Sequence, residues 1–192
     1  MRLNRSVIVK AAFAVLDKEG LDGLSLRLVA ERLHVQAPAL YWHVHNKAEL
    51  LDLMAATMSV TAARAELKER DWGARLIAYA RTLRTTMLKH RDSARLRAMA
   101  NPIEDPELTA RRLATPLIEA GLDGRRALSC QAAVIAYTLG WVAYEQNQSM
   151  REHIARMIDI EDSFDVGLRA MVYGFAAGNS RNVSRRKKSS PP

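Results

Sequence analysis

The residues best suited to recognition chemistry lie between positions 34 and 47, in the segment HVQAPALYWHVHNK. Gln36 offers a hydrogen-bond donor and an acceptor that suit the edge of an adenine, and Ala37 can contact a thymine methyl group. Tyr41 and His43 are long enough to reach the phosphates that flank a groove. These residue types, gathered in one short segment, predict a helix that reads double-stranded DNA through the major groove.

Three neighbouring residues extend the predicted contact surface. Pro38 fits the first turn of a helix, where the backbone N–H that it lacks would be unpaired in any residue. Lys47 and the free N–H groups at the start of the next helix predict a phosphate clamp. Arg27 can reach the groove or the backbone from the other side. The predicted DNA-binding residues are therefore Arg27, Gln36, Ala37, Pro38, Tyr41, His43 and Lys47.

The aromatic residues of this segment also allow a structural interpretation. Tyr41 and Trp42 would then pack in the core, and His43 would be an ordinary surface histidine. For Trp42 we adopt this interpretation, because a large indole is buried more often than it is exposed. For Tyr41 and His43 we expect DNA contact, because position, spacing and residue type agree.

The DNA-reading segment needs supporting helices, and the sequence before it supplies two. Apolar residues recur at helical spacing over residues 8–16 and again over residues 26–33. Gly20 is expected to end the first helix in a left-handed conformation, and Ser25 to cap the second. Residues 34–37 then form the turn of a helix-turn-helix motif.

The third helix is predicted to be short, about two turns from Pro38 to Val44. Leu40 and Val44 lie four residues apart, so they should anchor one face of this helix on the first two. Asn46 can then cap a fourth helix, and Glu49 three residues later comes close to a capping box.

The composition is that of a soluble globular protein. The 192 residues are 48% hydrophobic and 26% charged, enough for one or two small domains. No apolar run approaches the roughly 18 residues of a membrane span, and Lys10 and Asp17 interrupt the stretch that resembles a signal peptide. Cys130 is the only cysteine, which excludes an internal disulfide and favours a reducing, cytoplasmic location without a membrane partner.

The net charge of +8 is concentrated at the end of the chain. Residues 179–192 (NSRNVSRRKKSSPP) include five basic residues and no acidic one. Such a segment is too polar to pack, and we expect a disordered basic tail. The tail can add salt-dependent affinity for nucleic acid without sequence preference, or it can serve solubility alone.

The second half of the chain has residues typical of helix starts and helix ends, and it lacks the alternation of apolar and polar residues typical of strands. We therefore expect an all-α fold. Asp71 can cap one helix, and Gly121 can end another. Residues 127–144 are apolar on every side, and residues 164–175 form a second apolar helix. A helix that is apolar on every side must be covered on every side. Two such helices from each chain predict a four-helix homodimer interface.

The same half contains a candidate ligand pocket. Its predicted lining combines apolar and aromatic side chains with two polar ones: Leu83, Met87, Arg97, Met99, Tyr137, Trp141, Tyr144 and Glu145. Five arginines between positions 81 and 97 would suit an anionic or carbonyl-rich aromatic ligand, although such a charge run is more often a solvated face. We expect an aromatic or apolar small-molecule effector; a plain packed core is the alternative.

These segments resemble a known family. Residues 5–60 are similar to the DNA-binding domain of the TetR family of bacterial repressors, above all in Leu40–Val44 and in Asn46–Lys47. Residues 90–95 (HRDSAR) and 138–142 (TLGWV) resemble parts of the core in that family. The resemblance implies an all-helical homodimer, an operator with two-fold symmetry, and a small molecule that releases the DNA.

Two departures from the family bear on the ligand and on the operator. Members that bind a magnesium–tetracycline complex have a metal-ligating histidine where this chain has Arg97, and an acidic residue near Tyr144, with Glu145 one position on. Arginine cannot ligate Mg²⁺ and its charge would repel the ion, so we expect no metal and no cofactor. Ala37 and Leu26 replace more polar base-contacting residues, so the operator sequence should differ.

The predicted function is a sequence-specific DNA-binding transcriptional regulator, a repressor that a small-molecule inducer releases from a palindromic operator. We expect a helix-turn-helix domain over residues 1–46, a helical ligand-binding and dimerisation domain over residues 47–178 that is joined to it by the helix from 47, and the tail over residues 179–192. The alternatives are a constitutive or architectural DNA-binding protein without a ligand, and regulation by a docked protein partner. An enzyme is not expected, because the sequence has no nucleophile–base signature, phosphate loop or metal-ligand spacing.

Overall fold

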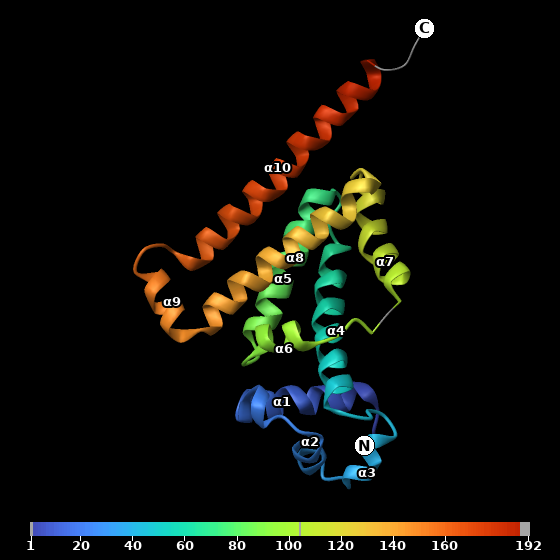
Figure 1. The fold of residues 1–192 in the computed structure, drawn as a ribbon, viewed down its shortest axis with the longest axis vertical. Coiled ribbons are helices and arrows are strands. Elements are labelled where there is room, and N and C mark those ends of the chain that lie inside the picture. Colours follow the sequence, from blue (N-terminus) through green and yellow to red (C-terminus); the bar gives the residue numbers. More distant parts are fainter. Residues whose placement is uncertain (1, 104, 189–192) are drawn as a thin grey trace.

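The first three helices form a small bundle at one end of the molecule (Figure 1). The computed structural model describes residues 2–103 and 105–188, with side chains up to residue 177, and these residues form helices and no strand. α1 spans Arg5–Gly23, α2 spans Leu26–Arg32 and α3 spans Ala37–Tyr41. The predicted all-α fold class is confirmed, and we call α1–α3 the N-terminal bundle.

The predicted end of α1 at Gly20 and the predicted cap of α2 at Ser25 can be compared directly with the structure. The Ser25 side chain caps α2 by accepting a hydrogen bond from the Leu28 N–H at 3.3 Å, as expected. Gly20 has a φ of +74°, a conformation that favours glycine. It kinks α1 rather than ending it, since a last turn continues to Gly23.

α3 is shorter than predicted, because it ends at Tyr41 instead of continuing to Val44. The N–H groups of His43 and Val44 both donate to the Leu40 carbonyl, at 2.8 and 2.9 Å. The chain therefore leaves the helix in a tight turn. That turn directs Val44 into the core, where Val44 and Leu40 are both fully buried.

α4 (Lys47–Glu66) connects the N-terminal bundle to the rest of the molecule (Figure 1). The Asn46 side chain accepts a hydrogen bond from the Glu49 N–H at 2.9 Å. The Glu49 carboxylate accepts one from the His45 N–H at 2.7 Å. This arrangement is close to the predicted capping box, with the returning bond one residue before the cap.

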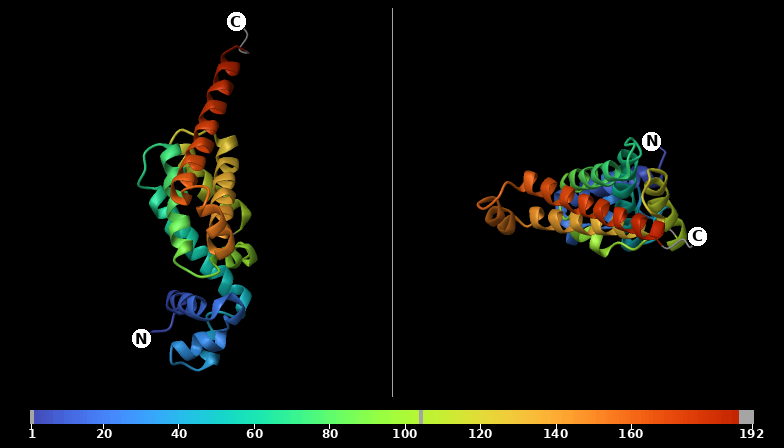
Figure 2. Two further views of the ribbon diagram at one scale, coloured as in Figure 1. Left: turned by 90° about the vertical axis from the view of Figure 1, so that its left-hand side faces the viewer. Right: turned by 90° about the horizontal axis from the view of Figure 1, so that it is seen from above.

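The remaining helices form the larger part of the molecule. They are α5 (Trp72–Leu88), α6 (Ser93–Met99), α7 (Pro106–Glu119), α8 (Gly124–Gln146), α9 (Gln148–Ala155) and α10 (Ile160–Lys188). Asp71 caps α5 by accepting the Ala74 N–H at 2.9 Å, as predicted. α8 and α10 lie side by side, and the end of α10 projects away from the N-terminal bundle (Figure 2).

Two buried clusters hold these helices together. One runs from α1 and α2 through α4 to Met87 on α5 and Leu96 on α6. The other joins α5, α7, α8 and α10 around Phe164 and Leu168. The first cluster crosses the expected domain boundary at residue 46, so α4 belongs to the core on both sides of that boundary.

The end of the chain differs from the expected disorder. α10 continues as a helix through Lys188, which includes residues 179–188 of the expected tail; residues 189–192 lie outside the described residues. Neither glycine nor proline occurs between Gly178 and Pro191, and arginine and lysine favour helix. A polar composition therefore does not stop this helix.

α8 differs from the expectation that no stretch of the chain is long and apolar enough to span a membrane. It is long and apolar enough, by length and composition, to span a membrane, although we expected no such stretch. Its sides pack against α5, α7 and α10, which is the environment of a core helix.

Candidate nucleic-acid interface

α3 lies at the end of the N-terminal bundle that points away from the rest of the molecule (Figure 1). Leu40 and Val44 are fully buried against α1 and α2, as the four-residue spacing predicted. Two buried anchors on one side leave the other side of a short helix facing solvent. This arrangement presents a helix end that can enter a groove.

The predicted contact residues are unequally exposed. Gln36 and Pro38 are exposed at the start of α3, and Tyr41 is 49% exposed at its end. Ala37 is half-buried against the core of the bundle. His43 is also half-buried, and its carbonyl oxygen accepts a hydrogen bond from Arg5 Nε at 3.1 Å.

Trp42 corrects an expectation, because its side chain is 87% exposed and does not pack in the core. Leu40 and Val44 fill the core positions on either side of it, so the residue midway between them points outward. The i, i+4 spacing of Leu40 and Val44 in the sequence already indicated that Trp42, midway between them, would face away from the core. An indole this exposed, beside Tyr41, belongs to the same solvent-facing surface as the predicted contacts.

The two predicted cationic contacts have partners within the chain. Arg27 is exposed on α2 and lies 3.5 Å from Glu31 one turn later. The Lys47 ammonium donates a hydrogen bond to the Leu21 carbonyl at 2.9 Å. An ammonium has three donors, so Lys47 keeps two after this contact.

The N-terminus of α4 differs from a simple phosphate clamp. The Glu49 carboxylate already lies there, bound to the N–H and the ring of His45 and to Arg5 Nη2 at 3.1 Å. The hydrogen bond from the His45 backbone is the main reason that the pKa of Glu49 is lowered. A fixed negative charge at this position repels phosphate, so Lys47 is the positive group left for a phosphate contact.

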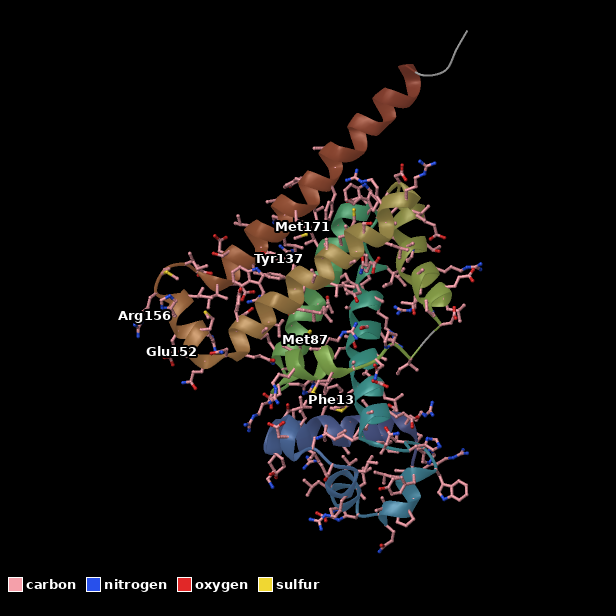
Figure 3. The ribbon with its side chains drawn as sticks, in the orientation of Figure 1. Phe13, Met87, Tyr137, Glu152, Arg156 and Met171 are labelled. Atoms are coloured by element: carbon pink, nitrogen blue, oxygen red, sulfur yellow. The ribbon has the colours of Figure 1, made fainter. Side chains whose placement is uncertain are left out.

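The predicted ligand-lining residues do not form one pocket. Leu83 and Met87 are buried in the cluster that reaches the N-terminal bundle. Tyr137 and Trp141 pack on the second cluster. Figure 3 places Tyr137 between α8 and α10. The Tyr137 hydroxyl donates a hydrogen bond to the Phe164 carbonyl at 2.9 Å. The crossing of α5 and α8 turns these two pairs toward different neighbours.

Three other members of the predicted lining are also placed elsewhere. Met99 and Tyr144 are exposed. Glu145 forms an ion pair with Arg84, with Nε and Oε1 2.7 Å apart. Sequence periodicity identified apolar and charged faces here, but it could not show which faces meet.

The arginines between positions 81 and 97 are mostly paired with carboxylates. Arg81 pairs with Asp165, Arg84 with Glu145, and Arg95 with Asp22. Arg91 lies 3.8 Å from Asp92. Arg97 differs, since its Nε is buried and has no hydrogen-bond partner among the described residues.

Arg97 lines a cavity of about 260 Å³ between α4, the chain after α6, and α7. Ser59 and Asp52 of α4 and Asn101 after α6 also line it. The Asn101 N–H donates to Asp52 at 2.6 Å, which fixes that part of the wall. The sequence reasoning identified Arg97 alone of these residues, because the others come from helices whose contact it could not predict.

Glu66, at the end of α4, gives a pH-dependent prediction. Its side chain is 3% exposed, and burial raises its pKa from 4.5 to about 7, against the opposing charges of Arg75 and Arg112. The folded state thus binds more protons than the unfolded state between these values, so stability should fall as pH rises from 4.5 to 7. Glu66→Gln should remove this dependence and raise the free energy of unfolding at pH 8 by up to about 3 kcal/mol.

The measurement is urea denaturation at several pH values, with the exposed Glu69→Gln as control. The control should keep the wild-type fall in stability between pH 4.5 and 7. An unchanged pH profile in Glu66→Gln would contradict the assignment.

Both halves of the chain match family models. Residues 8–54 match the model of bacterial regulatory proteins of the tetR family, and residues 65–157 match the tetracyclin repressor-like C-terminal domain. Among the residues that the structure describes, no group of three or more His, Cys, Asp or Glu side chains could hold a metal ion.

Individual relatives agree with these models. The class A tetracycline repressor protein from transposon 1721 of Escherichia coli is 37% identical over 150 residues, which cover 76% of this chain and 68% of that protein. The crystal structure of TetR from Acinetobacter baumannii AYE has a TM-score of 0.78 and 32% identity, and covers 93% of this chain and 99% of its own. TetR of class A, in complex with 5a,6-anhydrotetracycline and magnesium, has a TM-score of 0.71 and 32% identity, covering 91% and 99%.

The relatives are regulators, and the likeness extends over the N-terminal bundle as well as the larger helical part. This chain belongs to the TetR family of bacterial regulatory proteins and is a DNA-binding transcriptional regulator.

Proposed function

We propose that this chain is a repressor that binds a palindromic operator as a homodimer and that a small-molecule effector releases it. The observation that carries the proposal is the placement of α3, which is anchored by Leu40 and Val44 and exposes Gln36, Pro38, Tyr41 and Trp42 at its outer side. A dimer would present two such helices about 34–36 Å apart, in successive major grooves.

The contact residues have separate roles in this proposal. Gln36, Ala37 and Pro38 read base edges at the start of α3. Tyr41, His43, Lys47 and Arg27 contact phosphates and set the register. To these we add Trp42, whose exposed indole can pack on sugars or on thymine methyl groups.

Dimerisation is proposed through α8 and α10. These adjacent helices carry exposed apolar side chains: Leu128, Tyr144, Val166 and Tyr173. Covering them with the same helices of a second chain gives a four-helix interface with two-fold symmetry. The proposed location is the cytoplasm, where the operator would be.

The cavity beside Arg97 is the proposed effector site. It lies between α4, which leads to the N-terminal bundle, and α7. An effector that prefers a different position of α4 would change the separation of the two α3 helices, and it can shift DNA binding only by that preference.

The class A TetR structure holds 5a,6-anhydrotetracycline and magnesium, and Arg97 does not suit a magnesium ion at this cavity. Arg97 offers only donors and a fixed positive charge, so it cannot ligate a divalent cation. We therefore propose an effector that binds without a metal and accepts hydrogen bonds from the half-buried Arg97 guanidinium, whose Nε is buried.

Gln36→Ala tests direct base reading. With an operator selected from random duplexes, the variant should lose about 1–3 kcal/mol of binding free energy and become less selective at one base pair in each half-site. The measurement is competition binding with single-base variants of the operator. Equal affinity and unchanged selectivity would remove Gln36 from the proposed contact surface.

Lys47→Ala tests the phosphate contact. Affinity should fall about equally for all DNA sequences, and the slope of log K against log salt should decrease in magnitude by about 1. Lys68→Ala, an exposed lysine beyond the other end of α4, is the matched control and should leave the slope unchanged. If both variants keep the wild-type slope, Lys47 does not contact phosphate and only donates its hydrogen bond to the Leu21 carbonyl.

A further inference from the structure

A second, larger cleft lies where the N-terminal bundle meets the rest of the molecule. Its volume is about 690 Å³, and its walls come from α1, α4 and the end of α5. It shares no lining residue with the cavity beside Arg97. Figure 3 places Phe13 on the side of α1 that faces α4 and α5. The volume lies within the range of sites that bury a small molecule.

The floor of this cleft is apolar and held in place. Val9, Phe13 and Met58 line it, and each is largely buried in the core that joins α1 to α4. The Phe13 ring stacks on His90 with 4.2 Å between ring centroids. A flat or extended apolar group can therefore contact a preformed surface without moving these side chains.

The acidic group at one end of the cleft already has partners. Asp17 lies 3.0 Å from His90 Nδ1 and accepts the Arg91 N–H at 3.1 Å. Arg5, near the other end, is bonded to Glu49 and to the His43 carbonyl. Asp17 and Arg5 therefore already have hydrogen-bond partners within the chain.

Lys10 differs from both. It is exposed at the rim of the cleft, one turn from Phe13 and Ala14, and makes no hydrogen bond or ion pair with any residue that the structure describes. The cleft thus combines an apolar floor with one cation that has no partner in the described part of the chain. A ligand complementary to both is apolar at one end and anionic at the other.

We propose that this cleft is a second small-molecule site, and that it binds an amphipathic anion. The apolar body would lie on Val9, Phe13 and Met58, and a carboxylate or sulfonate would bind the Lys10 ammonium. Because α1 belongs to the N-terminal bundle and α5 to the larger part, an occupant contacts both and favours their present arrangement. The site is independent of the effector cavity beside Arg97.

The test is a fluorescence titration of the full chain with 8-anilinonaphthalene-1-sulfonate, an aromatic sulfonate that brightens in apolar sites. The wild type should bind one probe per chain in a saturable manner. Lys10→Glu should weaken binding by roughly tenfold or more, since it replaces a charge-assisted contact with repulsion. Lys68→Glu makes the same charge change beyond the far end of α4 and should leave the affinity unchanged.

A second pair of variants locates the probe. Ala14→Trp fills the cleft and should abolish binding, whereas Ala56→Trp fills the cavity beside Arg97 and should not. If Ala14→Trp does not fold, as judged by circular dichroism, the exposed Lys10 and Lys68 variants still decide. The proposal is overturned if the wild type shows no saturable binding, if Lys10→Glu binds like the wild type, or if Ala56→Trp alone removes the signal.

Discussion

Phe164→Ala is expected to lower the free energy of unfolding by about 3–5 kcal/mol. The ring is 1% exposed and lies among two other aromatic rings, with centroid distances of 5.4 Å to Tyr137 and 6.2 Å to Trp141. The Arg84 guanidinium lies over its face, 4.8 Å from the centroid. Truncation leaves a cavity where α5, α8 and α10 meet, and it removes the aromatic and cation–π contacts at once.

Urea denaturation measures this loss. The chain concentration must be the same for all variants, because the stability of a dimer depends on it. Leu67→Ala is the control, since Leu67 is 59% exposed after α4 and its truncation should change stability by at most about 0.5 kcal/mol. A loss below about 1 kcal/mol for Phe164→Ala would mean that this cluster does not hold α10 to the core.

Glu145→Ala is expected to cost about as much, roughly 3–5 kcal/mol, because it leaves a buried arginine without its main partner. Arg84 Nε and Nη2 bind the two oxygens of Glu145 at 2.7 and 2.8 Å, and both side chains are buried. Burial disfavours the charged form of Arg84, but its hydrogen bonds to Glu145 and Glu161 outweigh this and raise its pKa. Arginine is not deprotonated in proteins, so the guanidinium stays charged even when Glu145 is removed.

Two controls separate burial from charge. Glu161 also contacts Arg84, at 3.1 Å, but its side chain is exposed, so Glu161→Ala should cost no more than about 1 kcal/mol. Replacing both partners, Arg84→Met with Glu145→Leu, should recover most of the stability that Glu145→Ala loses. A double variant as unstable as the single one would show that the pair stabilises the fold in its own right.

The N-terminal bundle and the starts of α4 and α5 could be predicted from sequence because their signals are local. Ser25, Asn46 and Asp71 cap the helices that they were expected to cap, and Leu40 and Val44 are buried as their spacing required. A cap and an i, i+4 pair act within a single turn, so a linear reading of the sequence is sufficient.

The predictions for Trp42 and for the length of α3 were wrong for the same reason. General preference places an indole in the core, but Leu40 and Val44 are the fully buried residues of this segment, and the chain turns after Tyr41 to bury the second of them. Packing within the bundle overrides residue-type statistics at this position.

The ligand-binding half was predicted less well because its site depends on contacts between distant helices. Leu83 and Tyr137 each lie on an apolar face, as expected, but these faces belong to different clusters. Arg84 and Glu145 were treated as a possible charge run and a separate polar group, whereas they bind each other across 61 positions in the sequence. The crossing of α5 and α8 decides these pairings, and no local pattern encodes it.

Selection from a random library of DNA duplexes at physiological salt tests the central claim most directly. A dimer that reads DNA through two α3 helices should enrich a consensus with two-fold symmetry, with half-sites about one helical turn apart, and bind it at least 10³-fold more tightly than random DNA. Binding with a steep salt dependence but no enriched sequence would contradict operator recognition, and would indicate a protein that coats DNA through its basic residues.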